Sequence, residues 1–296
     1  MPRPPNEPLI FRHRAGAWDL TRRARVVGVL NLTPDSFYDG GRYLTSDAAF
    51  ARAEAMASEG ADAIDVGGQS TRPGAPALSA EEEWGRLSPL LPALIRSVPL
   101  PFSIDTYHAE VARRALDQGV AMVNDVSGLG VDPSLAEVTA RAGAGLILMH
   151  SHGAPSGLHV PREYEDVAME VRDFLERRAR LAEERGVPRR MIAIDPGIGF
   201  SKRAEQSVAA LAGISRLQEL GRPIYVGVSR KSFLGALTGE PVEGRLGPGL
   251  AVTVAAYLQG ARIFRTHDVR ETAQALRVVE QVEEARMKSE ISAGAT

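Results

Sequence analysis

The chain has 296 residues, of which 44% are hydrophobic and 24% charged, and its 35 lysines and arginines nearly balance its 37 aspartates and glutamates. This composition is that of an ordinary folded protein and excludes a disordered or collagen-like chain. The formal net charge of −2 provides no bulk basic field for nucleic acid or anionic lipid, so a bound anion requires a local cluster. Because the chain has no cysteine, disulfides, thiol nucleophiles and cysteine-ligated metals are excluded.

No stretch of the sequence is suited to a membrane or to secretion. Residues 1–8 contain no apolar core of a signal peptide. The longest uncharged run, residues 246–261, is interrupted by glycine, proline and glutamine and falls short of the ~20 apolar residues that cross a bilayer. We therefore expect a cytoplasmic protein without a membrane or nucleic-acid partner.

Short apolar segments alternate with longer amphipathic ones from residue 25 onward. The short segments are almost continuously hydrophobic, as parallel strands buried on both faces are. They are residues 25–31, 61–67, 100–105, 120–125, 145–150, 191–195, 223–229 and 261–267. The amphipathic segments predict helices over 47–58, 80–96, 109–118, 162–185, 204–220, 249–259 and 269–285.

Eight strand–helix alternations predict a single α/β domain comprising the whole chain, 1–296, and folded as a (β/α)8 TIM barrel. The barrel spans about residues 25–285, with long loops after the first and second strands. A doubly wound open sheet is the alternative architecture. Residues 1–24 form an N-terminal extension, expected to be a hairpin or lid across the bottom of the barrel. The polar tail 287–296 is expected to be disordered.

Polar residues stand at the end of each predicted strand. They are Asn31, Asp65, Asp105, Asn124 with Asp125, His150, Asp195, Ser229, and Arg265 with His267. Any one of them could simply cap the helix that follows. However, the C-terminal ends of barrel strands converge on one face, and unpaired buried charge is costly. Together they favour a shared polar ligand.

Two loops rich in glycine and proline follow the first two strands, at residues 31–41 and 67–74. The second contains Ser70, Thr71 and Arg72, which suit an anion, although an ordinary turn with an exposed arginine is the alternative.

Two further segments carry positive charge at predicted strand ends. Residues 229–232 place two cations at the start of a helix. Arg265 and His267 lie on the same side of a strand, because side chains alternate with a period of two, and such a pair suits phosphate. Neither a P-loop nor a G-x-G-x-x-G motif is present, so a nucleotide cofactor has no support. A zinc site at His150 and His152 is disfavoured because no H-E-x-x-H motif accompanies them.

Eight motifs resemble, in family order, those of the dihydropteroate synthases of the bacterial folate pathway, and they span most of residues 25–285. They are VGVLNLTPDSFYDGG (27–41), IDVGGQSTRPGA (64–75), SIDT (103–106), VNDVSG (123–128), LILMH (146–150), DPGIGF (195–200), VSRKS (228–232) and RTHDV (265–269). The first two are highly specific to the family, and the others gain weight from their order and spacing. The resemblance implies the same eight-stranded barrel and a homodimer.

The resemblance also implies a transferase reaction. Family members join 6-hydroxymethyl-7,8-dihydropterin diphosphate to 4-aminobenzoate, giving 7,8-dihydropteroate and diphosphate. The family mechanism is dissociative and assisted by Mg²⁺: cleavage of the C–O bond leaves a pterin-methyl cation, which the aminobenzoate nitrogen attacks. Sulfonamides imitate 4-aminobenzoate, so the resemblance implies that they bind as well.

The family's site residues map onto matching positions of this sequence. Catalytic roles fall to Asp105, Lys231 and Arg72. Pterin contacts fall to Asp105, Asn124, Met149, Asp195, Lys231 and Arg265. The 4-aminobenzoate side comprises Phe37, Thr71, Pro73, Phe200 and Ser229. The diphosphate is assigned to Asn31, Arg72, Arg265 and His267, and Asn31 is also the Mg²⁺ ligand. The chemistry of these residues agrees with the assignment. Carboxylates and an amide can accept hydrogen bonds from the pterin donors, and a lysine can donate to the pterin acceptors. An amide oxygen suits Mg²⁺.

The sequence departs from the family pattern at two positions and leaves two other functions open. Gln69 stands where glutamate is common, and Ser201 replaces a frequent glycine before Lys202. One alternative is a corrinoid-dependent methyltransferase of the same pterin-binding barrel, which has no use for the 70–74 loop or the Arg265–His267 pair. The other is a non-catalytic pterin-binding paralogue, against which the complete polar set argues.

Overall fold

The central element of the fold is a parallel barrel. The computed structural model describes residues 7–32, 46–70, 75–152 and 157–294. The barrel strands are β3 (Arg25–Asn31), β4 (Ala63–Gly67), β5 (Phe102–Asp105), β6 (Met122–Asp125), β7 (Gly145–Met149), β8 (Ile192–Asp195), β9 (Tyr225–Gly227) and β10 (Ile263–Thr266). They lie in the order β8-β7-β6-β5-β4-β3-β10-β9. A bridge between Ile194 and Ile224 joins the two edges, so the barrel is nearly closed and the prediction of a barrel is confirmed.

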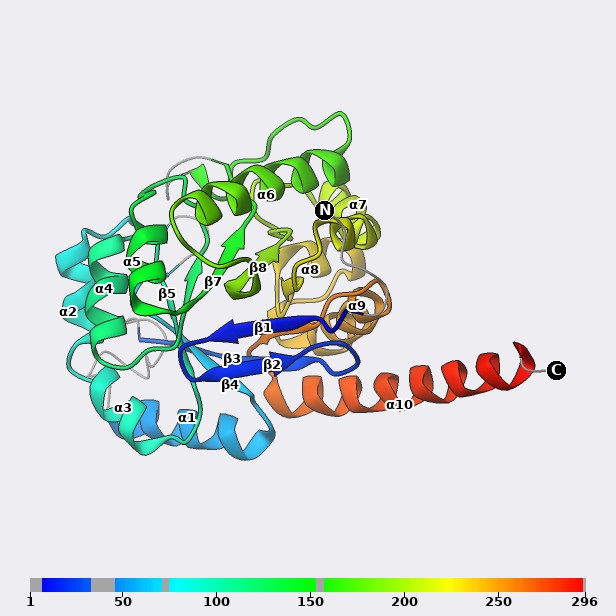
Figure 1. Cartoon of the computed structure of the whole chain (residues 1–296), viewed down its shortest axis with the longest axis horizontal. Helices are drawn as coiled ribbons and strands as arrows, with labels where there is room; N and C mark the ends of the chain where they lie inside the picture. The colour runs from blue at the N-terminus through cyan, green and yellow to red at the C-terminus, as the bar shows by residue number, and fades with distance from the viewer. Residues whose placement is uncertain (1–6, 33–45, 71–74, 153–156, 295–296) are drawn as a thin grey trace.

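Helices surround the barrel and cover the outward apolar face of its strands (Figure 1). They are α1 (Ser46–Glu59), α2 (Ala80–Leu87), α3 (Leu91–Ser97), α4 (Ala109–Asp117), α5 (Leu135–Ala142), α6 (Val167–Glu184), α7 (Ala204–Ala212), α8 (Ser232–Thr238), α9 (Leu246–Leu258) and α10 (Val269–Gly294). The predicted helix over 80–96 is two helices, because Pro89 and Pro92 interrupt it. The predicted helix over 204–220 becomes a 3-10 helix, Ile214–Leu220, after Gly213.

The N-terminal extension is a hairpin across the bottom of the barrel. Strands β1 (Ile10–His13) and β2 (Gly16–Asp19) pair antiparallel. Phe11, Trp18 and Leu20 pack with the apolar side chains that point inward at the first residues of the barrel strands. Gly145 leaves room for this contact, because a Cβ there would come within 2.8 Å of the Phe11 ring. The expected hairpin therefore seals one end of the barrel.

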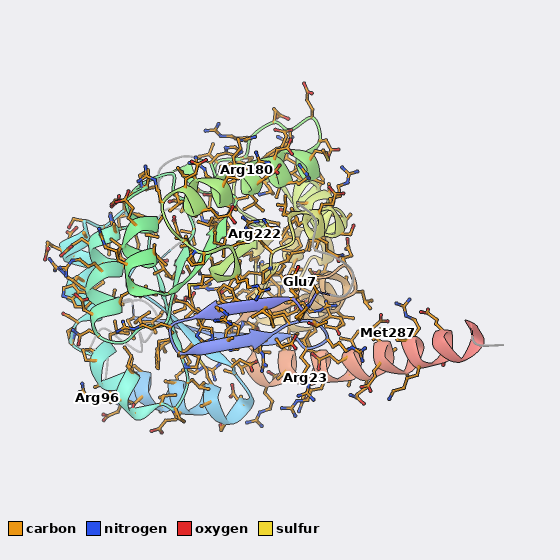
Figure 2. All side chains as sticks on the ribbon, viewed as in Figure 1. Glu7, Arg23, Arg96, Arg180, Arg222 and Met287 are labelled. Carbon is orange, nitrogen blue, oxygen red and sulfur yellow. The ribbon has the colours of Figure 1, made fainter. Side chains whose placement is uncertain are left out.

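The last helix differs from the prediction. Residues 287–294 were expected to be disordered, but α10 continues to Gly294, and the part that bears Met287 projects beyond the barrel (Figures 1 and 2). Ion pairs along the helix, such as Lys288–Glu284 at 2.8 Å and Arg286–Glu283 at 2.9 Å, support an exposed helix of this composition. In the described part of the chain, no helix has both the length and the apolar character to cross a membrane.

Candidate active site

The top of the barrel, where the strands end, contains a cavity of about 530 Å³. Strand register builds one side of it: Asn31 pairs with Gly67, Gly67 with Asp105, and Asp105 with Asn124, so these residues form a row across β3 to β6. The predicted site residues that line the cavity are Asn31, Asp105, Asn124, Met149, Asp195, Phe200, Ser229, Lys231, Arg265 and His267. Polar groups from separate strands are thus brought to one rim.

Four predicted site residues cannot be placed. Phe37, Thr71, Arg72 and Pro73 lie outside the residues that the structure describes. Gln69, just before the second of these segments, is described: its side-chain oxygen accepts a hydrogen bond from the Tyr107 hydroxyl at 2.8 Å. The departure from glutamate at this position therefore leaves a neutral hydrogen bond where a charge would otherwise stand.

A cluster of one guanidinium and two carboxylates lies at the floor of the cavity. Arg265 Nε lies 2.6 Å from Asp65 Oδ2, and Arg265 Nη2 lies 2.8 Å from Asp105 Oδ2. Asn124 Nδ2 also donates to Asp65 Oδ2, at 3.0 Å. Asp65 is fully buried one layer deeper than Asp105 on the neighbouring strand, and it does not line the cavity. It therefore holds both Arg265 and Asn124 from below.

The sequence motifs assign no role to Asp65. It was noted as a polar strand end, but the family motifs drew attention to the loop after it. The available signal was its position: Asp65 stands two residues before Gly67, so by the period of a strand both face the barrel interior. An inward carboxylate in an otherwise apolar strand requires a partner, and Arg265 is that partner.

The acidic and basic groups of the cavity perturb one another. Burial raises the pKa of Asp105, and the Arg265 guanidinium opposes this shift. Burial also raises the pKa of Asp195, against the effect of Lys231. Burial lowers the pKa of Lys231 to about 8, although Asp195 favours its charged form. Such shifted groups are typical of functional sites, where a ligand replaces the lost water.

Lys231 and Phe200 form the side of the cavity next to β8. Lys231 is the N-cap of α8, and its Nζ donates to the carbonyl oxygen of Ile198. The same Nζ lies 4.1 Å from the centroid of the Phe200 ring. The His159 ring stacks on the Phe200 ring, with 5.1 Å between the two ring centroids. The ring therefore has a fixed orientation at the cavity wall, held by a cation–π contact and by stacking.

Two more arginines line the cavity near β9. Arg230 has a left-handed backbone (φ 59°), a strained conformation for this residue type, and its Nε donates to Asp268 Oδ2 at 3.2 Å. Arg245 donates from Nη1 to the Arg230 carbonyl oxygen at 3.2 Å. Sequence reasoning gave a role to neither: Arg230 was noted only as one of two cations opening a helix, and Arg245 stands outside every motif. The cavity therefore holds more positive charge than predicted.

Two of the polar strand ends serve the fold rather than the cavity. Asp125 accepts hydrogen bonds from Ser127 N at 2.8 Å and Leu129 N at 2.6 Å, so it orders the loop after β6 and does not cap the next helix, which begins at Leu135. His150 is fully buried, with its Nδ1 2.9 Å from Lys202 Nζ. Among the residues described, no group of three or more histidines and carboxylates could hold a metal ion.

Asn31 fits the expected Mg²⁺ ligand by its chemistry and position. Its Oδ1 and the Oδ2 of Asp105 are both near Gly67, each 3.8 Å from where a Cβ on that glycine would stand. Mg²⁺ prefers oxygen ligands and is commonly held by one or two protein groups together with substrate phosphates and water. Since Asn31 lines the cavity, a cation there could be shared with a bound diphosphate.

Comparisons with known proteins agree with this geometry. Residues 27–267 match the family model described as pterin binding enzyme. The chain is 43% identical over 265 residues to the dihydropteroate synthase of Synechocystis, covering 89% of this chain and 91% of that protein. It is 41% identical to the Escherichia coli dihydropteroate synthase, covering 86% and 90%.

A solved structure gives the same result. The Xanthomonas albilineans dihydropteroate synthase with 4-aminobenzoic acid superposes with a TM-score of 0.87 at 40% identity, covering 94% of this chain and 99% of that one. The family model matches well over half of the chain, and these relatives match it along most of their own length. The chain therefore belongs to the dihydropteroate synthases, transferases of folate synthesis within the pterin-binding enzymes.

Proposed function

We propose that this protein joins 6-hydroxymethyl-7,8-dihydropterin diphosphate to 4-aminobenzoate, releasing diphosphate and 7,8-dihydropteroate. The observation that carries the proposal is the convergence of Asp105, Asn124, Asp195 and Lys231 on one cavity. Relatives support the choice of substrates: structures of the Xanthomonas albilineans enzyme are described with 4-aminobenzoic acid and with 7,8-dihydropteroate. The alternative function, a corrinoid-dependent methyltransferase, has no use for the Arg265–His267 pair that lines the cavity.

The pterin ring is assigned to the deep, polar part of the cavity. Its amine and N–H donors face the carboxylates of Asp105 and Asp195 and the amide oxygen of Asn124, while Lys231 donates to a ring acceptor. Met149 supplies an apolar surface, and the Arg265 guanidinium can stack on the ring face. A buried set of this kind rejects analogues that lack the matching groups, because the protein groups would be left unpaired.

The 4-aminobenzoate is assigned to the outer part of the cavity, beside Phe200 and Ser229, with Phe37, Thr71 and Pro73 completing its side. Phe200 offers an aromatic surface whose orientation is fixed by its neighbours. Lys231 stands between the two substrate positions. Sulfonamides share the shape and charge of 4-aminobenzoate, so we propose that they compete for the same place.

The reaction requires stabilisation of a departing anion. As the C–O bond breaks, its electron pair leaves with the diphosphate. Arg265 and His267 line the cavity and would stabilise this charge, a role that the proposal also assigns to Arg72. Asn31 would hold Mg²⁺, which neutralises diphosphate charge when bound. The carboxylate of Asp105 stabilises the positive charge left on the pterin. The aminobenzoate nitrogen then forms the new C–N bond, and its proton passes to the departing diphosphate. Exclusion of water during this step prevents hydrolysis of the cation.

The direct test is diphosphate release by the purified protein. We expect turnover that requires both substrates and Mg²⁺ and gives dihydropteroate by mass spectrometry. Folded protein that binds the pterin in calorimetry but forms no product would favour the non-catalytic paralogue instead. Methyl transfer from methyltetrahydrofolate to a corrinoid would establish the methyltransferase.

We also propose that the protein is a cytoplasmic homodimer. Val278 and Val282 lie one turn apart on α10 and are 66% and 59% exposed, so they form an apolar strip on a helix that projects from the barrel. Light scattering after size exclusion should give twice the mass of the chain, and Val278→Glu with Val282→Glu should reduce it if this strip is buried in the dimer. A wild-type mass equal to that of one chain would refute the dimer.

A further inference from the structure

One buried charged residue takes no part in the proposed reaction. Lys202 is 7% exposed and follows the loop 196–200 at the end of β8. Its Nζ is 2.9 Å from His150 Nδ1, 3.0 Å from the Gly197 carbonyl oxygen and 3.1 Å from the Phe200 carbonyl oxygen. An ammonium has three N–H donors and no acceptor, so these three partners satisfy it completely.

His150, the residue that follows β7, accepts a hydrogen bond from Lys202. Burial, together with the neighbouring charge of Lys202, lowers the pKa of His150 to about 2, so the imidazole is neutral. A neutral imidazole has one acceptor nitrogen, and the contact with Lys202 assigns that role to Nδ1. Burial and Lys231 lower the pKa of Lys202 itself to about 7, whereas Asp195 favours its charged form. The two carbonyl oxygens can only accept, which also favours the ammonium.

The loop that Lys202 holds has an unusual backbone. Gly197 and Gly199 have φ angles of +63° and +79°, and Ser201 has +51°, a conformation that costs energy for a residue with a side chain. A Cβ at Gly197 would lie 1.9 Å from the His150 carbonyl oxygen. The loop is thus pressed against the end of β7 in a conformation that needs outside contacts to persist.

The other face of this loop forms part of the cavity. The Ile198 carbonyl oxygen accepts from Lys231, and the Phe200 ring lies beneath the same ammonium. Gly197 N donates to Asp195 Oδ1 at 2.7 Å. A shift of the loop would therefore move Phe200 and change the surroundings of both Lys231 and Asp195.

We propose that Lys202 is a positioning residue, whose ammonium ties loop 196–200 to His150 and thereby sets Phe200 and Lys231 against the two substrates. The amino-acid usage of the chain supports this. Only three of the 35 basic residues are lysines, and two of the three, Lys202 and Lys231, are at this loop. A planar guanidinium cannot direct three donors from one point, so this position requires lysine where the chain otherwise uses arginine.

The inference rests on the proposed function, and the experiment begins with Lys202→Met. We expect folded protein whose kcat/KM falls about 10- to 100-fold, with a raised KM for 4-aminobenzoate, because small displacements of positioning groups have effects of this size. A merely structural role would reduce the amount of active enzyme and leave KM unchanged. Lys288→Met makes the same change on exposed α10 and should match wild type.

The absence of cysteine allows the ammonium to be restored chemically. In Lys202→Cys, the thiol is the only one in the chain, and 2-bromoethylamine alkylates it in denaturant: sulfur displaces bromide and gains an aminoethyl group with a terminal ammonium. After refolding, we expect the KM for 4-aminobenzoate to return to within a few-fold of the wild-type value. The wild-type control is denatured, treated with the same reagent and refolded in the same way. Should Lys202→Met not fold, Lys202→Gln, which keeps two N–H donors for the carbonyl oxygens, replaces it. A wild-type KM in the folded variants, or no recovery on aminoethylation, overturns the proposal.

A second readout separates this inference from the proposed function. Amide hydrogen exchange of residues 197–201 needs no activity, and we expect faster exchange in Lys202→Met that slows again in the aminoethylated protein. If the wild type shows no turnover, the proposed function fails, and this measurement alone decides whether Lys202 holds the loop. Unchanged exchange would reject that role.

Discussion

The two ends of the barrel are built from the same strands but differ in chemistry. At the bottom, the first residues of the strands are apolar and packed against Phe11, Trp18 and Leu20 of the hairpin. At the top, acidic, basic and amide side chains at or near the strand ends, such as Asp105, Asn124 and Arg265, line an open cavity. The bottom therefore supplies stability and the top supplies chemistry, a division that the barrel permits because side chains at opposite strand ends do not meet.

The two ends also differ in the charged groups that they pair. In the described part of the chain, buried atoms without a hydrogen-bond partner occur toward both ends, for example the His13 ring nitrogens and Arg25 Nε at the bottom and Asp65 Oδ1, Glu83 Oε1 and His150 Nε2 toward the top. At the top, Arg265, Asp105 and Asn124 are joined to one another or to Asp65. Neutral groups can remain unpaired at moderate cost, whereas a buried charge requires an opposite charge or a ligand.

The largest effect is expected from opening the bottom. Phe11→Ala removes a fully buried ring that fills the barrel end, which should lower the free energy of unfolding by about 3–5 kcal/mol. Urea unfolding followed by circular dichroism measures this loss, and Arg12→Ala, on the exposed face of the same strand, is the control. KM for both substrates should not change. A changed KM with unchanged stability would contradict the separation of the two ends.

The next effect concerns the top alone. Asp105→Asn keeps the shape of the side chain but removes the charge that stabilises the pterin cation, so kcat should fall by about 10²- to 10³-fold, as when one preorganised electrostatic group is lost. The unfolding transition should stay close to that of wild type. Wild-type kcat in this variant would remove Asp105 from the proposed mechanism.

A smaller effect is expected below the cavity. Asp65→Asn weakens the ion pair with Arg265 and the hydrogen bond from Asn124, but the side chain does not contact substrate. We therefore expect kcat/KM for the pterin diphosphate to fall roughly 10- to 100-fold. KM for 4-aminobenzoate should change little. Ser103→Ala, which removes an unpartnered hydroxyl from the neighbouring strand, is the matched control. Equal effects of both variants would mean that Asp65 only fills space.

The strand pattern alone predicted the barrel and the rim on which the polar residues meet. Buried parallel strands are continuous apolar runs, and the β3 prediction over 25–31 agrees with the structure residue for residue. The predicted helix ends agree less well with the structure where prolines separate α2 from α3. The polar composition of the tail predicts disorder, but residues 287–294 continue α10, because pairs such as Lys288–Glu284 stabilise an exposed helix.

The cavity was less predictable than the fold, because its details depend on contacts between distant segments. Asp65 and Arg265 are 200 residues apart, and no local pattern links them. Arg245 reaches the cavity from the start of α9, which sequence reasoning had no cause to place there. No motif assigns a role to Lys202, and one of its three partners, His150, lies 52 residues away in the sequence.

The smallest effect tests a buried carboxyl at the top that has no cation in close contact. Glu83 on α2 is 1% exposed and accepts from the Thr106 hydroxyl at 3.1 Å, while His108 Nε2 is 3.9 Å away. Burial raises its pKa to about 8, although the bond from Thr106 opposes this. The folded state therefore binds a proton that the unfolded state releases above about pH 4.5. The associated stability is complete below that pH and is lost as pH rises through 8.

Comparison with Glu83→Gln isolates the contribution of Glu83 ionisation to the free energy of unfolding, because the amide imitates the protonated acid at every pH. We expect wild type to lose about 2 kcal/mol relative to the variant between pH 5 and 6.5, at about 1.4 kcal/mol per pH unit, which corresponds to roughly 2–4 °C in Tm for each kcal/mol. Thermal unfolding at several pH values measures it, and titrations common to both proteins cancel in the difference. If Tm depends on pH in the same way in both proteins, Glu83 ionises without cost. A buried carboxylate at the top would then need no partner, and the contrast between the two ends would be weaker than the contacts of Asp65 indicate.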